Sequence, residues 1–343
     1  MHVTSKIRRR LGPAVACALL AACSAGAPGT MTPNAPQRDA SGARTENTTI
    51  FISGSNPSAV YVLNSKGDIV STLTDDLNVP QGLAVDRSGD LYVANLGAPN
   101  ILVFAPPYTG TPTVISDEAG ASPLDVAVDA SGNLAVANLS TASGNGDVVL
   151  YAAGATSPTS IISSPNFQQP RYCAFDKHGN LFLDNIQTSE APRSHLGVAG
   201  PGDRSENVTI GEIRGGLHGT SITQLQTSNQ IDNGEAGSVQ VTSSGKIAID
   251  NYVTPGGTGG NIYTYGAPKH NDLGAPAMLH LRRSIQPTTF AFTVGSKRLF
   301  TADYSLDAAQ AYTYPGGRLL KTFHFPSRQL VQGVAIYPNQ QFP

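Results

Sequence analysis

The sequence predicts an all-β domain: a six-bladed β-propeller closed by its C-terminal strand, which completes the first blade. Three observations predict this fold. One segment recurs along the chain at propeller spacing, and the two ends of the domain share a single repeat. In addition, 36 glycines and 24 prolines among 343 residues favour short strands and turns over long helices. With 40% hydrophobic and 13% charged side chains, the chain can bury one large core.

The recurring segment reads AVDRSGDLYVANL at 84–96 and AVDASGNLAVANL at 127–139. Further copies lie at 174–186 and 240–252, and a more divergent copy lies at 291–304. One apolar position of the repeat is occupied in turn by Leu91, Leu134, Leu181, Ile247 and Leu299, at spacings of 43, 47, 66 and 52 residues. Periods of about 40 to 50 residues with several short strands each indicate propeller blades.

Each repeat predicts four strands, which we name a to d from the central channel outward. Strands a and b are of the GLAVD and LYVAN types. Between them, Asp86 supplies an Asx-type turn and Gly89 a residue that tolerates positive φ. Strands c and d follow, for example at 101–106 and 111–116, with alternating β-branched and aromatic residues. The aromatic residues of strand c are predicted to pack between blades; they are Phe104, Tyr151, Tyr265 and Tyr314.

The first repeat begins without a strand a. Its segments TIFISGS, AVYVLNS and DIVSTLT match strands b, c and d. The missing strand lies at the other end of the chain, where QGVAIYP at 332–338 copies QGLAVD at 81–86. Pairing of the two ends removes an open sheet edge. We expect six blades; seven is the alternative if 218–226 contains extra strands.

The first 22 residues predict a lipoprotein signal peptide. Lys6 and the three arginines at 8–10 form a positive head, and the apolar run at 11–22 is far shorter than the ~20 residues of a spanning helix. The sequence Leu20-Ala21-Ala22-Cys23 resembles the lipobox of bacterial lipoproteins, which implies that Cys23 carries the lipid and becomes the first mature residue. Ser24 then implies sorting to the outer membrane. The alternative is an ordinary signal peptide.

Residues 23–47 are rich in Ala, Gly, Pro, Thr and Ser and predict a flexible tether. We therefore expect an exported protein on the outer membrane or the periplasmic face, with the lipid as its only membrane contact. Cys17 leaves with the signal, so Cys173 has no partner for a disulfide within the mature chain. The chain has 22 Lys and Arg and 24 Asp and Glu, so it carries no excess of positive charge. A nucleic-acid partner is therefore not expected.

Strand direction alternates within a blade, so the b–c and d–a connections emerge on one face of the ring. We call this the variable-loop face, because its b–c connections differ in length and sequence while the a–b turns are uniform. The longest connection, 214–237, is assigned to the same face. Variety on one side of a rigid ring indicates a binding surface. The alternative is that these connections are tolerated insertions without function.

Polar residues recur where strand b ends, at the mouth of the channel on this face. The predicted metal ligands are Asn95, Asn138, Asn185, Asn251 and Asp303, with Gly54 at this place in the first blade. Such oxygens suit Ca²⁺ or another divalent cation. The alternative is structural, because Asn readily closes a strand into a loop. Strand a begins at the same mouth with candidate ligand-binding residues, namely Gln81, Asp125, Arg171, Tyr172 and Gln332. Asp184 and Asp250 precede the rim by one residue, so alternation directs them to the opposite sheet face.

The repeat PQGLAVDRSGDLYVAN resembles those of the NHL-repeat and gluconolactonase-like (senescence-marker-type) six-bladed propellers over residues 48–343. The resemblance implies a fold shared by enzymes and binding scaffolds. For the enzymes it implies a divalent metal held by a Glu, an Asn and an Asp, for which Asn138 or Asn185 and Asp303 would supply two ligands. Gln332 stands where the acidic ligand is expected, and a neutral amide is a poor ligand and a poor base.

The function we expect is a binding or scaffolding module for a small ligand or a protein on the bacterial envelope. One alternative is a metal-dependent, lactonase-like hydrolase or a lyase, with His218 as its candidate catalytic base. His218 is flanked by glycines in the long connection, which would let it overhang the mouth. Another alternative is a purely structural envelope protein. No cofactor other than a divalent cation is indicated.

Overall fold

The computed structural model describes residues 48–187, 207–228, 235–252, 260–326 and 328–339. The predicted signal peptide, the predicted lipidation site Cys23 and the predicted tether lie outside the described residues. The described residues all belong to one compact unit, Glu46–Pro343. Within this part of the chain, no helix has the length and apolar character needed to cross a bilayer.

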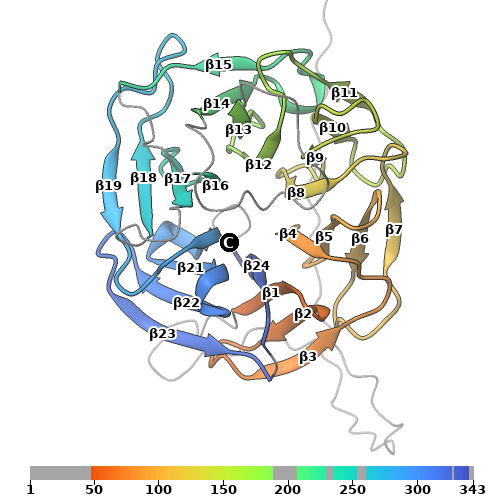
Figure 1. Cartoon of the computed structure of the whole chain (residues 1–343), viewed down its shortest axis with the longest axis vertical. Helices are drawn as coiled ribbons and strands as arrows, with labels where there is room; N and C mark the ends of the chain where they lie inside the picture. The colour runs from red at the N-terminus through yellow and green to blue at the C-terminus, as the bar shows by residue number, and fades with distance from the viewer. Residues whose placement is uncertain (1–47, 188–206, 229–234, 253–259, 327, 340–343) are drawn as a thin grey trace, which may run out of the picture. The chain divides into compact units, whose positions relative to one another are not determined.

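In the described part of the chain, six four-stranded antiparallel sheets form the blades of a ring (Figure 1). Blade one contains β24 (Val331–Tyr337), β1 (Thr49–Ser55), β2 (Ser58–Leu63) and β3 (Ile69–Leu73); blade two contains β4 (Pro80–Val85), β5 (Leu91–Asn95), β6 (Asn100–Phe104) and β7 (Thr113–Ser116); blade three contains β8 (Pro123–Val128), β9 (Leu134–Asn138), β10 (Asp147–Tyr151) and β11 (Ser160–Ile162). Blade four contains β12 (Pro170–Phe175), β13 (Leu181–Gln187), β14 (Asn207–Ile213) and β15 (Thr223–Leu225); blade five contains β16 (Glu235–Val241), β17 (Ile247–Tyr252), β18 (Asn261–Tyr265) and β19 (Ala277–His280); blade six contains β20 (Pro287–Phe292), β21 (Arg298–Asp303), β22 (Ala308–Thr313) and β23 (Leu319–His324). The predicted fold class is confirmed.

The ring closes as predicted, because β24 pairs with β1 from the other end of the chain. In this antiparallel ladder Ile50 lies opposite Ile336, and Ile52 lies opposite Val334. Figure 1 shows the C-terminal strand beside β1 on the inner side of blade one. Backbone hydrogen bonds thereby join the first and last strands of the domain, and the inner edge of β1 is not left open.

The a–b turns repeat one hydrogen-bonding device. Asp86 Oδ1 accepts the Ser88 and Asp90 N–H groups at 2.8 and 2.9 Å, and Asp129 and Asp176 make the same contacts in blades three and four. The turn also requires a left-handed residue, which Gly89 provides at φ +89°. The predicted Asx-type turn is therefore present.

The core lies between neighbouring blades. Ile50, Ile336 and Phe300 belong to one buried cluster that joins blade one to blade six. The strand c aromatics behave as predicted in blades two, three and five, where they are buried. Blade six differs, because β22 ends at Thr313 and Tyr312 occupies the buried position, leaving Tyr314 half-buried beyond the strand.

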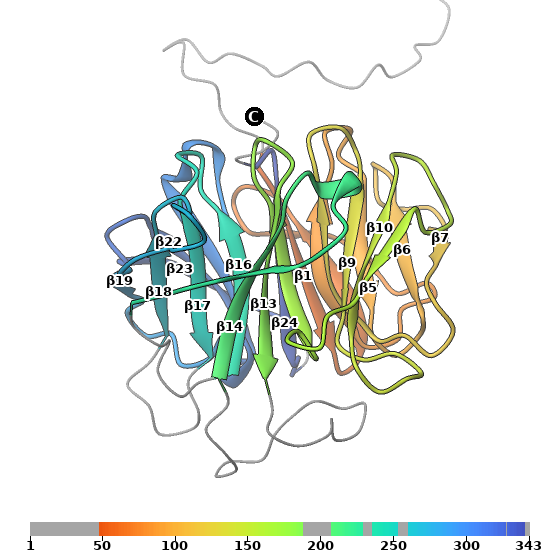
Figure 2. The same ribbon diagram turned by 90° about the horizontal axis from the view of Figure 1, so that it is seen from above.

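The connection at 214–237 does not lie wholly on the variable-loop face, and this prediction was wrong. Its first part is a c–d turn containing the 3₁₀ helix η1 (Gly216–His218), after which β15 forms strand d of blade four. In Figure 2 this turn lies at the upper end of the ring, whereas β13 runs toward the lower end. Segment 218–226 therefore adds one strand to blade four and no seventh blade. Two short 3₁₀ helices follow in blade six, η2 (Val294–Ser296) and η3 (Tyr304–Leu306).

Candidate binding face and channel mouth

A β-bulge interrupts the beginning of the innermost strand in every blade. In blade four, for example, Pro170 pairs with Asn185 and Cys173 with Leu183, which leaves two residues opposite one. The predicted ligand-binding residues all lie in or beside these bulges: Gln81, Asp125, Arg171, Tyr172 and Gln332. The structure thus places them on one ring at the mouth.

Hydrogen bonds join several bulges to the neighbouring blade. Ser53 Oγ of blade one donates to the Gln81 carbonyl oxygen of blade two at 2.6 Å. Thr288 Oγ1 of blade six donates to the Gln332 carbonyl oxygen of blade one at 2.8 Å. Asp125 is buried, and its Oδ2 accepts the Cys173 N–H of the next blade at 3.0 Å. These polar atoms at the mouth therefore form hydrogen bonds that join neighbouring blades.

The predicted metal ligands at the ends of strand b fasten loops. Asn95 Oδ1 accepts the Asn78 N–H at 2.7 Å, and Asn185 Oδ1 accepts the Gln169 N–H at 2.8 Å. The Asp303 carboxylate likewise accepts two consecutive N–H groups. Each donor lies in the d–a connection that enters the same blade. These contacts favour the structural interpretation, and metal binding by this set stays a prediction.

Three blades differ at the rim. A Cβ on Gly54 would collide with the Gln329 side chain, which occupies that place in blade one. Asn138 in blade three donates through Nδ2 to Asp147 Oδ1 at 2.9 Å, but its Oδ1 has no partner among the described residues. The side chain of Asn251 lies outside the described set. Among the described residues, no three His, Cys, Asp or Glu side chains are already gathered as a metal centre.

Two buried carboxyl groups at the mouth were missed by sequence reasoning. Asp184 and Asp250 are fully buried and face the bulges of their own blades. Asp184 Oδ1 accepts the Tyr172 N–H at 2.7 Å. Asp250 lies against Gly237, whose missing Cβ makes room for it. The repeat could have indicated them, because the other four blades have serine or alanine where these two blades have aspartate.

Burial raises the pKa values of these acids. The pKa of Asp125 rises to about 8, since the Cys173 N–H compensates only part of the lost hydration. Burial also raises the pKa values of Asp184 and Asp250 well above the usual range, and Arg171 opposes the shift at Asp184. Burial likewise raises the pKa of the Cys173 thiol, which makes it a poor nucleophile.

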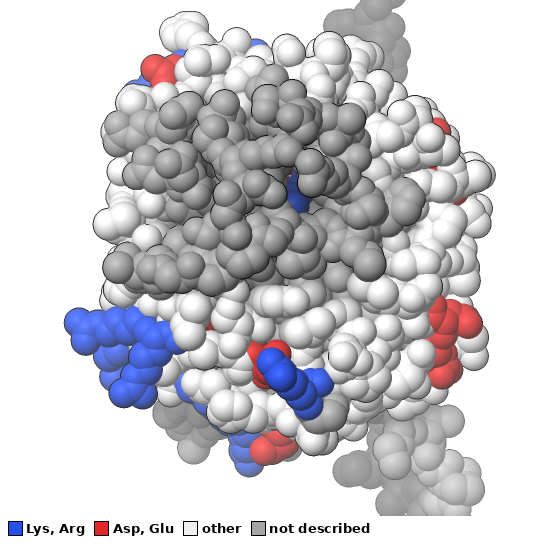
Figure 3. Space-filling model, viewed as in Figure 1, with Lys and Arg blue, Asp and Glu red and all other residues white. Residues whose placement is uncertain are grey.

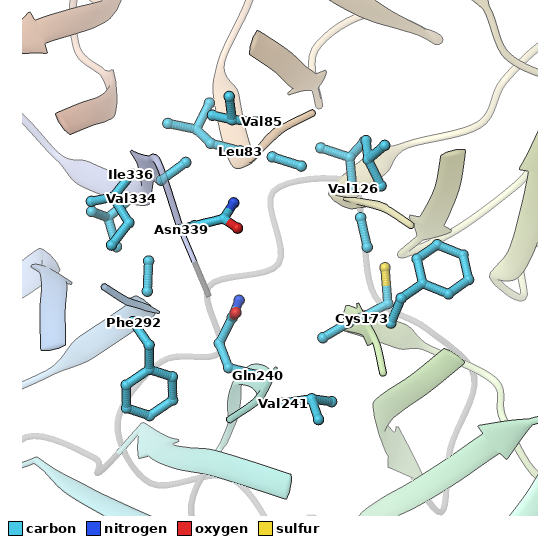
Figure 4. Close-up of a pocket in the computed structure, with 17 residues that line it drawn as sticks. Leu83, Val85, Val126, Cys173, Gln240, Val241, Phe292, Val334, Ile336 and Asn339 are labelled. Atoms are coloured by element: carbon cyan, nitrogen blue, oxygen red, sulfur yellow. The ribbon is translucent and has the colours of Figure 1, made fainter. Parts of the chain in front are cut away.

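The channel below the mouth is narrow and mostly apolar. It contains a cavity of about 60 Å³ lined by the innermost strands, which has room for a few waters. Five blades place alanine at one lining position, and blade five places Gln240 there. Figure 4 shows the amides of Gln240 and Asn339 pointing into the channel among apolar side chains. Because ligand pockets usually span about 300 to 1,000 Å³, this cavity does not suit a large ligand.

His218 lies away from the mouth. It is exposed in η1, where Gly215 N–H donates to Asn180 Oδ1 at 3.1 Å, beside the a–b turn of blade four. A Cβ on Gly216 would collide with the Gly179 carbonyl oxygen of the same turn. The predicted position over the mouth was therefore wrong, because the glycines make a c–d turn on the opposite face.

The variable-loop face carries opposite charges on its two sides. Asp75 and Asp76 are exposed in the d–a connection between blades one and two. Arg282 and Arg283 are exposed in the connection between blades five and six. The side chain of Arg328, between blades six and one, is 87% exposed. Figure 3 shows blue groups at the lower left and red groups at the right; a blue group with red beside it lies between them, surrounded by uncharged described surface.

Comparisons with known proteins bear on the fold only. No protein-family model matches the chain. No curated protein matches it either. Many chains of solved structures do match. One is a chain from "Crystal structure of Nidogen/Laminin Complex", with a TM-score of 0.63 and 16% identity, covering 84% of this chain and 98% of that one. This similarity supports the propeller fold, whereas the NHL and gluconolactonase-like assignment rests on the repeat alone.

Proposed function

We propose that this protein is an exported, lipid-anchored propeller that binds a protein partner through its variable-loop face. The observation that carries the proposal is the separation of charge on that face, with Asp75 and Asp76 on one side and Arg282 and Arg283 on the other. Such a pattern orients an approaching partner of complementary charge and penalises wrong orientations. Exposed arginines also often anchor protein interfaces.

Two further features favour a protein over a small ligand. The axial cavity is small, and the carboxyl groups at the mouth are buried against bulges and neighbouring strands. Ile285 is 46% exposed next to the arginine pair, so an apolar contact lies beside the charged ones. The structurally similar chain comes from a complex named for two proteins, nidogen and laminin. A chain of similar fold is thus found in a protein complex, which supports a protein as the partner.

The proposed export and lipid anchoring rest on the N-terminal sequence. The positive head, the short apolar run and the lipobox-like Leu20-Ala21-Ala22-Cys23 support export and lipidation. The Pro- and Gly-rich stretch after Cys23 would let the ring stand off the membrane with its binding face accessible. A lipid anchor and a tethered ring suit a scaffold that holds a partner at the envelope.

Photo-cross-linking in cells tests this proposal. A photoreactive residue at Ile285 should form a protein adduct on illumination, and the same residue at Lys177, in an exposed a–b turn of the other face, should not. Combining the Ile285 probe with Arg282→Glu and Arg283→Glu should abolish the adduct. Equal adducts from both faces, or an adduct indifferent to charge reversal, would contradict binding at this surface.

A further inference from the structure

Blade three breaks the rim pattern that blades two, four and six share. In those blades the terminal oxygen of strand b accepts an N–H group from the entering d–a connection. In blade three the corresponding N–H groups bond elsewhere: Ala121 donates to the Glu118 carbonyl oxygen at 3.0 Å, and Ser122 to the Ser140 carbonyl oxygen at 2.9 Å. Asn138 is fully buried, and its Oδ1 is left without a partner among the described residues. A buried acceptor without a donor is costly and calls for a bound species.

Two carboxyl groups lie against this amide, and a third lies against one of them. Asp147 Oδ1 accepts the Asn138 Nδ2–H at 2.9 Å, and Asp117 also lies within hydrogen-bonding range of Asn138. Asp117 Oδ1 accepts the Tyr151 hydroxyl at 3.2 Å, while its Oδ2 is buried without a partner among the described residues. The Glu118 carboxyl lies within hydrogen-bonding range of Asp147.

Among the described residues, no Lys, Arg or His contributes to the pKa shifts of Asp117 or Asp147. The ion pairs found in the described residues, Arg214–Glu212 and Arg328–Asp307, lie in other blades. Burial, together with the nearby Glu118 and Asp117 carboxyl groups, raises the pKa of Asp147 to about 6. Burial raises the pKa of Asp117 as well. Like charges held together without a cation repel one another, so a bound cation would stabilise the set.

We propose that Asp117, Glu118, Asn138 and Asp147 form a binding site for a divalent cation, with Ca²⁺ as the best fit. Ca²⁺ takes carboxylate and amide oxygens in flexible arrangements, which suits ligands from a loop and two strands. Among the described residues these carboxyl groups do not surround one point, and the Asn138 amide presents Nδ2 to Asp147, so cation binding requires the amide to turn its Oδ1 toward the carboxyl groups. Glu118 is half-buried in the d–a connection, so it is the ligand best able to move inward. This site does not depend on the proposed function.

Terbium luminescence on the full chain tests the site. The chain has no tryptophan, so tyrosine must sensitise bound Tb³⁺, and Tyr151 is bonded to the proposed ligand Asp117. Tb³⁺ should give a saturable signal that Ca²⁺ displaces. Glu118→Gln and Asp147→Asn should each weaken binding by about tenfold or more, because affinity follows the number of ligand charges.

The controls separate ligation from stability. Asp68→Asn, in an exposed c–d turn of blade one, should leave Ca²⁺ binding unchanged. Tyr151→Phe should reduce the luminescence while calorimetry with Ca²⁺ still detects binding. Glu118 is half-buried, so Glu118→Gln should fold even if Asp147→Asn does not. A signal that Ca²⁺ cannot displace, or that Glu118→Gln leaves unchanged, would overturn the proposal.

Discussion

The Cys173 N–H donates a 3.0 Å hydrogen bond to Asp125 Oδ2, which joins the innermost strands of blades three and four at the channel mouth. The carboxyl group is buried, and its pKa is raised to about 8. A structural contact between blades is therefore made by an ionisable group that holds its proton at neutral pH.

This contact predicts a pH-dependent stability. In the unfolded chain Asp125 loses its proton near pH 4, and in the folded chain near pH 8, so unfolding is favoured progressively between these values. The contribution of this group to the free energy of unfolding should fall by about 4 kcal/mol between pH 4 and pH 7. Asp125→Asn keeps an acceptor for Cys173 and should flatten the decline in urea titrations. An unchanged pH slope would show that Asp125 is ionised in the folded protein.

Ring closure predicts a strong effect at Ile336. This side chain is 1% exposed in β24, opposite Ile50 of β1. Ile336→Ala should lower the free energy of unfolding by about 2 to 5 kcal/mol, through lost burial and a new cavity. Ile161 in β11 is 47% exposed, so Ile161→Ala should change it by about 0.5 kcal/mol or less. Similar losses in both variants would argue against closure by β24.

The close approach of Gly237 and Asp250 predicts that substitutions at these two positions have coupled effects on stability. A Cβ on Gly237 would collide with the Asp250 carboxyl, so Gly237→Ala should destabilise the protein by about 1 to 3 kcal/mol. Gly266 has open space at its Cβ position, and Gly266→Ala serves as the control. Combining Gly237→Ala with Asp250→Ala should recover part of the loss in a double-mutant cycle. Additive losses would mean that the two side chains do not compete for one space.

Blades, turns and closure could be predicted because they depend on local patterns. Apolar alternation defines the strands, and the Asp86 turn depends on residues only a few positions apart. The bulges could not be predicted, because an extra residue shows only in how two strands pair, and short alternating segments do not reveal that pairing. Burial of Asp184 follows from its bulge, and the position of His218 follows from a c–d turn made by glycines. The first depends on how β12 pairs with β13, and the second on contacts such as that between Gly215 and Asn180, which are 35 residues apart.

The proposed anchor predicts the behaviour of a cysteine variant. Cys23→Ser removes the thiol that the lipobox-like sequence offers, so the protein should lose its acyl chains and leave the membrane fraction. Metabolic labelling with a fatty-acid analogue and fractionation of the envelope measure both effects. Cys173→Ser is the matched control and should retain lipid, because Cys173 is buried in β12. Equal labelling of wild type and Cys23→Ser would contradict the anchor.

The proposed calcium site predicts an affinity that rises with pH. Cation binding requires ionised carboxylates, and the pKa of Asp147 is raised to about 6. Below this value a proton must leave before Ca²⁺ binds, so the apparent affinity should fall by about tenfold per pH unit for this one group. Above it the affinity should level off. Calorimetric titrations at pH 5, 6 and 7.5 measure this profile, and Asp147→Asn should remove the step while weakening binding at high pH. A pH-independent affinity in the wild-type chain would mean that Asp147 is not a ligand.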